Sequence, residues 1–195
     1  MFNTKVSEHF KLKEFCVTNT NPSKFIPLNT KFAIEKFDVL QELSTKILEP
    51  LRTHMIKYHG FNALRINSGV RCPELNTAIG GSKTSQHSHA EACDINMSPN
   101  PKNTTRDLKL KALKGIYLDI VQGKVEGLNL EDIGQCIFEM TAAGSVWLHI
   151  SLKTQRFIDF RKASGRPYVT EFLVTTTGKA GSFIPYKEGI LDTIK

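Results

Sequence analysis

Hydrophobic positions recur along the chain at two spacings, and the longer spacing predicts helices. From residue 37 to residue 55, apolar residues and one serine follow each other at three- and four-residue steps, which predicts one face of an amphipathic helix. These positions are Phe37, Leu40, Ser44, Ile47, Leu51 and Met55. Pro50 lacks a backbone N–H, so it is expected to kink or divide this helix, and Gly60 is expected to end it.

A second helix is expected after residue 104. Thr104 and Asp107 have the types and spacing of a helix-opening cap, and Gly123 marks the expected end. The predicted buried stripe consists of Leu113, Ile116, Tyr117, Ile120 and Val121.

Shorter apolar runs, several of them alternating with polar residues, predict β-strands. The predicted strands are 63–68, 92–97, 135–140 and 146–152. Small and polar residues at 141–145 separate the last two strands, which therefore predict a β-hairpin.

The remaining segments carry weaker signals. Pro73 is suited to begin a short helix over 73–79, which two glycines stop. The polar stretch 17–31 is expected to form a loop or an extended strap, and 96–103 is expected to form a loop rich in Asn and Pro. The tail from residue 155 onward contains strand-like pieces, such as 168–175, without an assigned role.

These elements predict an α+β fold in a single domain that spans residues 1–195. We expect a small antiparallel sheet that carries the functional side chains on one face, with helices packed on the other. A chain of 195 residues is long enough to bury a hydrophobic core of this kind.

The formal net charge of +7 favours an anionic partner through long-range attraction. Nucleic acid, anionic lipid and the phosphate-rich bacterial envelope all meet this description. The basic residues are scattered, however, and the sequence contains neither an arginine-rich run nor a nucleic-acid-binding motif. A modest group of cations follows residue 101 and is interpreted as a solvated helix face, so binding to nucleic acid is not expected. That group consists of Lys102, Arg106, Lys109, Lys111 and Lys114.

Apolar runs of the length of a membrane span, ~18 residues or more, are absent from the sequence. Residues 1–5 contain no apolar core of a signal peptide, which predicts synthesis and retention in the cytoplasm. The cysteines show no C-x-x-C pairing and are expected to be reduced and mostly buried. They are Cys16, Cys72, Cys93 and Cys136. Cys93 is expected to point to the side of its strand opposite to that of its neighbour Asp94.

A candidate metal site comes from His87, Asp94 and His149. A turn at Ala90 followed by a strand can bring His87 and Asp94 to one side of a cavity, and His149 lies in a later strand. Two histidines and one carboxylate are the ligands of a catalytic zinc ion that keeps a fourth position for water. A surface loop and a core histidine are the alternative interpretation of the same spacing.

The surrounding residues resemble the zinc D-alanyl-D-alanine carboxypeptidase family and its phage endolysin relatives. Ser85, His87, Ala92 and Asp94 reproduce a Ser-x-His motif that is followed at fixed spacing by Ala and Asp. The other similar blocks are Ser68–Asn76, Gly80–Ser82, Trp147–Ser151 and the early His9–Phe15. The resemblance covers roughly residues 5–155 and leaves 156–195 as an extension of unknown role.

The resemblance implies an α+β architecture, a zinc ion held by His87, Asp94 and His149, and an Arg71 that binds a substrate carboxylate or the oxyanion. It also implies that Ser85 orients the site. The chain departs from the family pattern at three positions. Ala90 replaces the usual Gly, Val70 replaces a Tyr, and Val146 stands where many relatives have an acidic residue.

Glu139 is the candidate general base. If the hairpin turns about Ala143, Glu139 lies opposite Trp147, which shares a strand face with His149. The alternative for Glu139 is a solvent-facing strand residue, and the alternative for Arg71 is a structural salt bridge.

Three further side chains are candidates for the same cleft. Gln86 is a candidate hydrogen-bond donor to the substrate, and Trp147 is expected to wall the cleft or to fill core. His89 is a possible substitute ligand that is expected to face solvent.

The sequence therefore predicts a zinc-dependent peptidoglycan peptidase, a D,D-carboxypeptidase or an endopeptidase, which cuts cell-wall stem peptides. A phage or prophage origin would explain the missing signal peptide, because such enzymes reach the wall through a holin-made lesion or as part of a virion. The alternative is a non-catalytic virion-structural or wall-binding protein that retains the peptidase fold.

Overall fold

The computed structural model describes residues 2–98, 105–167, 169–175 and 182–194. The strands are β1 (Ala63–Ser68), β2 (Ala92–Ser98), β3 (Ile133–Met140), β4 (Val146–Leu152), β5 (Glu171–Val174) and β6 (Ile184–Pro185). The α-helices are α1 (Leu12–Cys16), α2 (Pro22–Glu35), α3 (Phe37–Leu43), α4 (Glu49–His59), α5 (Pro73–Ala78), α6 (Arg106–Val121) and α7 (Gln155–Ala163). A π-helical turn η1 (Ser44–Leu48) and the 3₁₀ turns η2 (Gln86–His89), η3 (Leu130–Asp132) and η4 (Ile190–Thr193) complete the elements.

The strands form one six-stranded sheet in the order β1-β2-β4-β3-β5-β6. All neighbouring strands pair antiparallel except β3 and β5, which run parallel. The α+β architecture and the predicted β3–β4 hairpin are thereby confirmed, with β3 beginning two residues earlier than expected.

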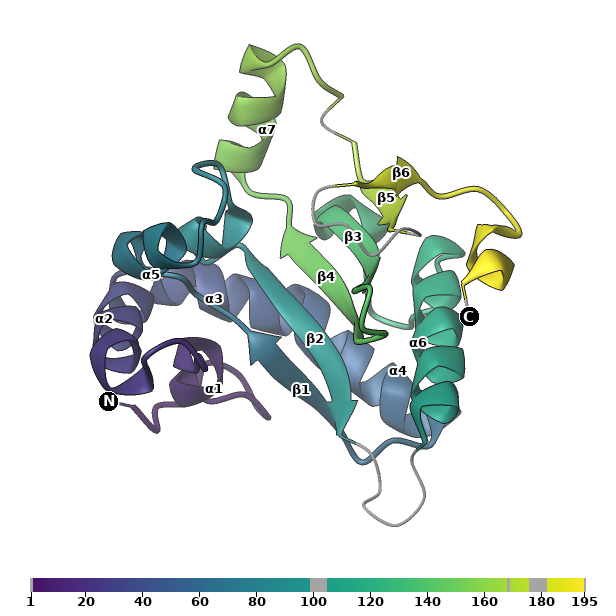
Figure 1. Ribbon diagram of the computed structural model, residues 1–195, viewed down its shortest axis with the longest axis horizontal. Helices are drawn as coiled ribbons and strands as arrows, with labels where there is room; N and C mark the ends of the chain where they lie inside the picture. The colour runs from purple at the N-terminus through teal and green to yellow at the C-terminus, as the bar shows by residue number, and fades with distance from the viewer. Residues whose placement is uncertain (1, 99–104, 168, 176–181, 195) are drawn as a thin grey trace.

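Alternation along the strands separates a polar face from an apolar one. In β2, Asp94 and Asn96 face one side, whereas Cys93, Ile95 and Met97 are buried on the other. The buried side packs against α3, η1, α4 and α6 in a single core cluster. Figure 1 shows α3 and α4 behind the sheet, which leaves the polar face free of these helices.

The helical pattern between residues 37 and 59 is confirmed in its extent and in its division. The run continues from α3 through the π-turn η1 into α4, and Pro50, which lacks an N–H, directly follows this turn as the second residue of α4. Gly60 ends the run in the left-handed conformation (φ 67°), as expected of a helix C-terminus.

The prediction of a loop over 17–31 was wrong, because most of this segment forms α2. Pro22 begins the helix, and Phe25, Asn29 and Ala33 form a buried face at four-residue steps. Asn29 explains why the pattern looked polar: it is fully buried but accepts a hydrogen bond from the Cys72 backbone N–H and donates one to the Cys16 carbonyl.

Other boundaries differ from the sequence predictions by a residue or more. The cap of α6 is Thr105, whose side chain accepts a hydrogen bond from the Leu108 N–H, rather than Thr104, which lies outside the described residues. Of the loop expected at 96–103, residues 96–98 belong to β2 and residues 99–103 lie outside the described part. In the tail, the strand β5 lies within the strand-like piece expected at 168–175, whereas the helix α7 was not predicted.

The four cysteines are buried and unpaired, as expected of reduced thiols. Cys93 points away from Asp94 into the core, as predicted. None of the described helices combines the length and apolar composition that a membrane span requires.

Candidate metal centre

The register of β2 and β4 brings the predicted ligands together. Asp94 and His149 are directly opposed in the antiparallel ladder, so their side chains project on the same face. His87 reaches them from η2, the 3₁₀ turn that precedes β2. The ligand atoms of His87, Asp94 and His149 all lie within 4.8 Å of one another, and both histidines are buried.

The hydrogen bond of His87 fixes which ring nitrogen faces this cluster. Nδ1 donates to the Gly69 carbonyl oxygen at 2.7 Å. A carbonyl only accepts, so Nδ1 carries a proton, and a neutral ring would present the lone pair of Nε2 to the cluster. Nε2 lies 3.2 Å from Asp94 Oδ1, an acceptor. A bound cation or a second ring proton is required to make this contact favourable.

His149 is held by a chain of buried amides and hydroxyls. Its Nε2 lies 3.0 Å from Gln86 Oε1, and the Gln86 amide donates to Ser151 Oγ at 2.8 Å. Ser151 Oγ also accepts from the Gln135 backbone N–H. The opposite nitrogen of His149, Nδ1, lies 3.0 Å from Asp94 Oδ1. The Gln86 side chain, a candidate donor to the substrate, instead contacts the predicted ligand His149.

Asp94 divides its two oxygens between the histidines and an arginine. Oδ1 faces His87 and His149, whereas Oδ2 accepts from Arg71 Nη2 at 3.1 Å. Arg71 Nη2 also donates to Ser68 Oγ at 3.0 Å, which orients the guanidinium. Burial would raise the pKa of Asp94, but the charge of His87 and the hydrogen bonds from both histidines hold it well below its usual range. The carboxylate is therefore ionised and suited to bind a cation.

The turn that connects His87 to β2 carries backbone strain. Ala90 is the C-terminal cap of η2 and adopts the left-handed conformation, with φ 59° and ψ 20°. Left-handed backbone costs a non-glycine residue about 1–2 kcal/mol. Ala90, where the family usually has glycine, therefore carries strain. The backbone N–H groups of Ala90 and Glu91 donate to the carbonyls of His87 and Gln86, which holds the turn in place.

This strain predicts an unusual response to glycine. We expect Ala33→Gly, in helix α2, to lower the free energy of unfolding by about 1–2 kcal/mol, from lost helix propensity and a lost buried methyl. Ala90→Gly loses a methyl that is equally buried but relieves the left-handed strain, so its change should stay within about 1 kcal/mol of zero. Urea unfolding of both variants measures the difference, and equal losses would contradict the strain.

The structure places Glu139 on the face of the cluster. Glu139 pairs with Trp147 across the β3–β4 hairpin, the register expected from the sequence, and Trp147 is two residues from His149 on the same face. Burial raises the pKa of Glu139 above its usual value, and the charge of the nearby His149 opposes part of this rise.

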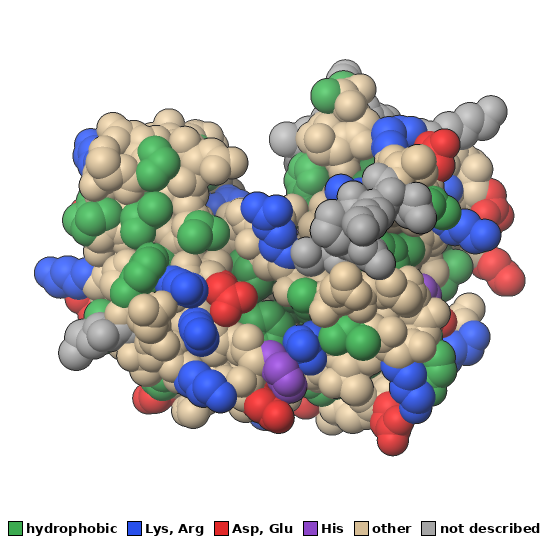
Figure 2. Space-filling view, turned by 90° about the horizontal axis from the view of Figure 1, so that it is seen from below, with side chains coloured by type: hydrophobic (Ala, Val, Ile, Leu, Met, Phe, Trp, Pro, Cys, Tyr) green, Lys and Arg blue, Asp and Glu red, His purple; other side chains and the backbone are tan. Residues whose placement is uncertain are grey.

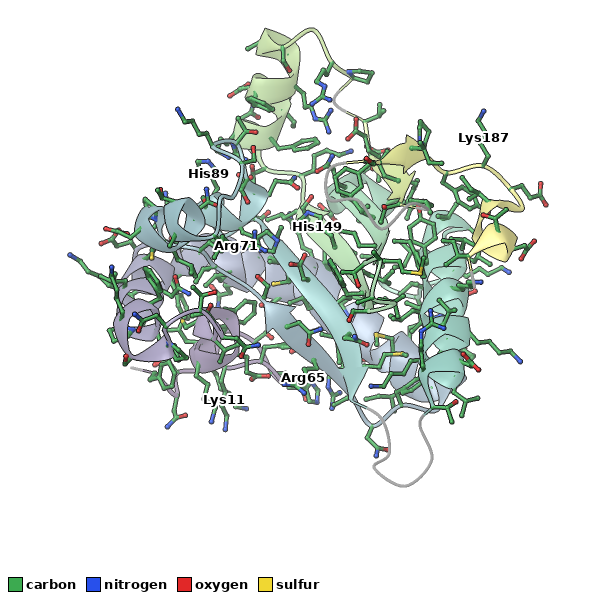
Figure 3. The ribbon with its side chains drawn as sticks, in the orientation of Figure 1. Lys11, Arg65, Arg71, His89, His149 and Lys187 are labelled. Atoms are coloured by element: carbon green, nitrogen blue, oxygen red, sulfur yellow. The ribbon has the colours of Figure 1, made fainter. Side chains whose placement is uncertain are left out.

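The remaining predicted residues surround the cluster to different degrees. Ser85 is the half-buried residue before η2. Trp147 lines a hollow of about 390 Å³ together with Asn67 and Asn96, and Arg71 lines an adjoining hollow that also contains Asn67. Figure 3 shows Arg71 and His149 near the same end of the sheet, with His89 farther out at the periphery. His89 is not part of the cluster in the described structure.

The donor set fits a zinc ion. Two imidazoles and one carboxylate converge from three elements, the outer nitrogen of each imidazole has an oxygen partner, and Arg71 holds the second oxygen of the carboxylate. Such outer contacts orient the ligands of metal sites in proteins.

Comparison with known proteins identifies the family. Residues 8–118 match the protein family described as Peptidase M15, over more than half of the chain. The chain belongs to the peptidase M15 family. Its family-level activity is therefore that of a zinc metallopeptidase. The match contains Arg71, His87 and Asp94, whereas Glu139 and His149 lie beyond it. The comparison with curated proteins found no match.

Sequence reasoning missed the residues that orient the ligands of this M15 chain. The Gly69 carbonyl, Ser68 and Ser151 each hold a ligand or its partner. The role of Ser151 could in principle have been predicted, because Ser151 lies two residues after His149 on the same strand face. Gly69 acts through its backbone, which no residue type reveals. A Cβ at Gly69 would lie 2.4 Å from the Phe15 carbonyl oxygen, so glycine is required there for packing.

Proposed function

We propose that this M15 chain is a zinc-dependent peptidoglycan peptidase, a D,D-carboxypeptidase or an endopeptidase, that cuts cell-wall stem peptides. The observation that carries the proposal is the His87–Asp94–His149 cluster, in which two buried imidazoles and one carboxylate bring their ligand atoms within 4.8 Å of one another. We further propose a phage or prophage origin, with delivery to the wall through a holin-made lesion or in a virion.

In this proposal His87 Nε2, Asp94 Oδ1 and His149 Nδ1 hold the zinc ion. A bound zinc ion supplies Lewis-acid chemistry, since it polarises the scissile carbonyl and acidifies a water molecule. Gly69 and Gln86 keep both imidazoles in the required orientation. Asp94 keeps its charge because the two histidines and Arg71 surround it.

Glu139 acts as the general base. Its carboxylate takes a proton from the attacking water and passes it to the leaving amine. The raised pKa of Glu139 favours this role, because a base with greater proton affinity removes the proton more readily. Val146, where many relatives have an acidic residue, is the buried first residue of β4 and pairs with Met140. In this proposal Glu139, on the facing strand β3, supplies the carboxylate that Val146 lacks.

Arg71 binds the substrate carboxylate or the oxyanion. The side chain is 21% exposed although it contacts Asp94, and it lines the hollow at the end of β1. Stem peptides carry free carboxylates, which guanidinium groups bind through paired hydrogen bonds. Trp147, with Asn67 and Asn96, lines the neighbouring hollow and would form the wall of the substrate cleft.

The charge of the chain fits a wall substrate better than nucleic acid. Figure 2 shows basic side chains spread over the lower face with acidic ones between them, rather than a continuous basic stripe. A net charge of +7 that is distributed in this way favours general attraction to an anionic envelope.

Purified, zinc-loaded protein is expected to release soluble peptide or D-alanine from isolated sacculi. Chelator should stop the release and added zinc should restore it, because the cluster is the source of the Lewis acid. Mass spectrometry of the products identifies the bond that is cut. The absence of release from sacculi of several cross-link types, by protein shown to contain its zinc, would favour the non-catalytic virion or wall-binding alternative.

A further inference from the structure

A second cluster of ligand-type side chains lies between α4 and α6. His54 Nε2 and His59 Nε2 each lie 2.9 Å from the same oxygen of Asp119, Oδ2. The ligand atoms of these three residues lie within 4.8 Å of one another, as in the first cluster. His54 and His59 come from the second half of α4, and Asp119 comes from α6.

This cluster is separate from the proposed catalytic centre. Helix α6 packs on the sheet face that carries Phe138, as the 6.0 Å ring contact between Tyr117 and Phe138 shows. Phe138 pairs with Leu148, the neighbour of His149, so both point away from the face of Asp94 and His149. The second cluster therefore lies among the helices on the opposite side of the sheet (Figure 1).

Gly115 in α6 leaves space for this arrangement but lowers the stability of the helix. A Cβ at Gly115, in α6, would lie 2.9 Å from His59 Cε1. Glycine in a helix interior is unfavourable relative to alanine. The absence of a side chain at Gly115 lets the His59 ring lie against α6, one helical turn from Asp119, where its Nε2 reaches the carboxylate.

The ionisation of the cluster suits a cation. Burial would raise the pKa of Asp119, but hydrogen bonds from His54 and His59 lower it overall below its usual value. The side chain of His54 is 6% exposed, and its Nδ1 is buried without a hydrogen-bond partner among the described residues. The cluster therefore combines an ionised carboxylate with two imidazoles, the side-chain types that bind zinc.

A hollow of about 350 Å³ borders the cluster at His54. The carboxylates of Glu8, Glu49 and Glu126 line it beside one lysine, Lys57. This excess of negative charge favours the approach of a cation. The side chain of Asp119 is 23% exposed, so water can supply a further ligand.

We propose that His54, His59 and Asp119 form a second metal site, which binds a zinc-class divalent cation and fastens the end of α4 to α6. Two imidazoles and one carboxylate suit zinc and its neighbours in the first transition row, rather than calcium or magnesium, which prefer oxygen ligands. The two clusters present the same arrangement, with two imidazole nitrogens directed at one carboxylate oxygen.

Elemental analysis of zinc-loaded, dialysed protein tests this site. Wild type should bind two ions per chain, and His149→Ala and His59→Gln should bind one each. The double variant should bind none. Asp119→Asn, which keeps a hydrogen-bond acceptor for the histidines but removes the charge, should also bind one. His59→Gln should retain peptide release from sacculi, because His59 lies behind the sheet.

Thermal unfolding gives an independent measurement. In the His149→Ala background, free zinc at a hundred times its Kd should raise Tm by roughly 5–10 °C, and the additional His59→Gln change should remove this rise. The matched control is His9→Gln, because His9 borders the same hollow and contacts Glu49 at 2.7 Å without belonging to the cluster.

The control variant His9→Gln should match wild type in its zinc content and in the rise of Tm with zinc. Binding of one ion per chain by wild type, unchanged by His59→Gln and Asp119→Asn, would overturn the proposal and leave the cluster as a hydrogen-bonded contact between helices. Equal loss of zinc in His9→Gln and His59→Gln would also overturn it, because the binding would then be a property of the surface hollow.

Discussion

A His149→Ala variant is expected to bind one zinc ion fewer per chain than wild type and to lose its release of peptide from sacculi. In the proposed zinc site His149 is one of three ligands, and removal even of an outer contact of a metal ligand costs about 10–100-fold in affinity. Loss of the ligand itself should exceed about 100-fold. Elemental analysis and the sacculus assay measure the two effects on the same preparation.

His89→Ala is the matched control for this experiment. His89 lies in the same 3₁₀ turn as His87, two residues away, but is outside the cluster in the described structure. It should keep both zinc and activity. Equal zinc in wild type and His149→Ala would exclude His149 as a ligand, and loss of zinc in His89→Ala would make His89 the substitute ligand instead.

The pairing of β2 with β4 explains how far the site could be predicted. Local alternation indicated both strands, and the side of β2 on which Asp94 lies followed from the buried Cys93. The direct opposition of Asp94 and His149 is a long-range register over more than fifty residues. No local pattern specifies such a register, and here only the resemblance to a family of known site residues linked the two.

The Glu139 register could be predicted because it is local. The hairpin needs only the position of its turn, and a turn at residues 141–145 aligns Glu139 with Trp147. The role of Gln86 could not be obtained in this way. Its amide faces inward because Ser151 and His149, both on β4, provide partners for it.

Helix α2 and the cluster of His54, His59 and Asp119 were not predicted from the sequence, for different physical reasons. In α2, the buried position Asn29 is polar, and its hydrogen bonds to Cys16 and Cys72 replace the apolar contact that a sequence pattern requires. His54 and His59 are five residues apart, which is not a same-face spacing in a helix. They converge because His59 is the last residue of α4 and Gly115 leaves space for its ring.

Glu139→Gln is expected to keep the zinc and the fold while it lowers the rate of peptide hydrolysis by about 10²–10⁴, the usual contribution of a general base. Glutamine has nearly the same shape but cannot accept the proton of the attacking water. The loss should fall on kcat more than on KM, because proton transfer occurs in the transition state. Rates on a soluble stem peptide, together with elemental analysis, measure it.

Glu139→Asp separates the base from a merely structural carboxylate. The shorter side chain keeps a proton acceptor on the same strand face, so its rate should lie between those of Glu139→Gln and wild type. A structural role predicts instead that both variants lower the free energy of unfolding and leave the rate per folded molecule unchanged. An unchanged rate in Glu139→Gln with full zinc content would move the base to another group.

The dependence of the hydrolysis rate on pH gives a further measurement. Burial raises the pKa of Glu139, so protonation of this carboxylate should lower the wild-type rate on the acid side of the pH profile. This fall should be weakened or lost in Glu139→Gln, a change that a structural carboxylate would not produce.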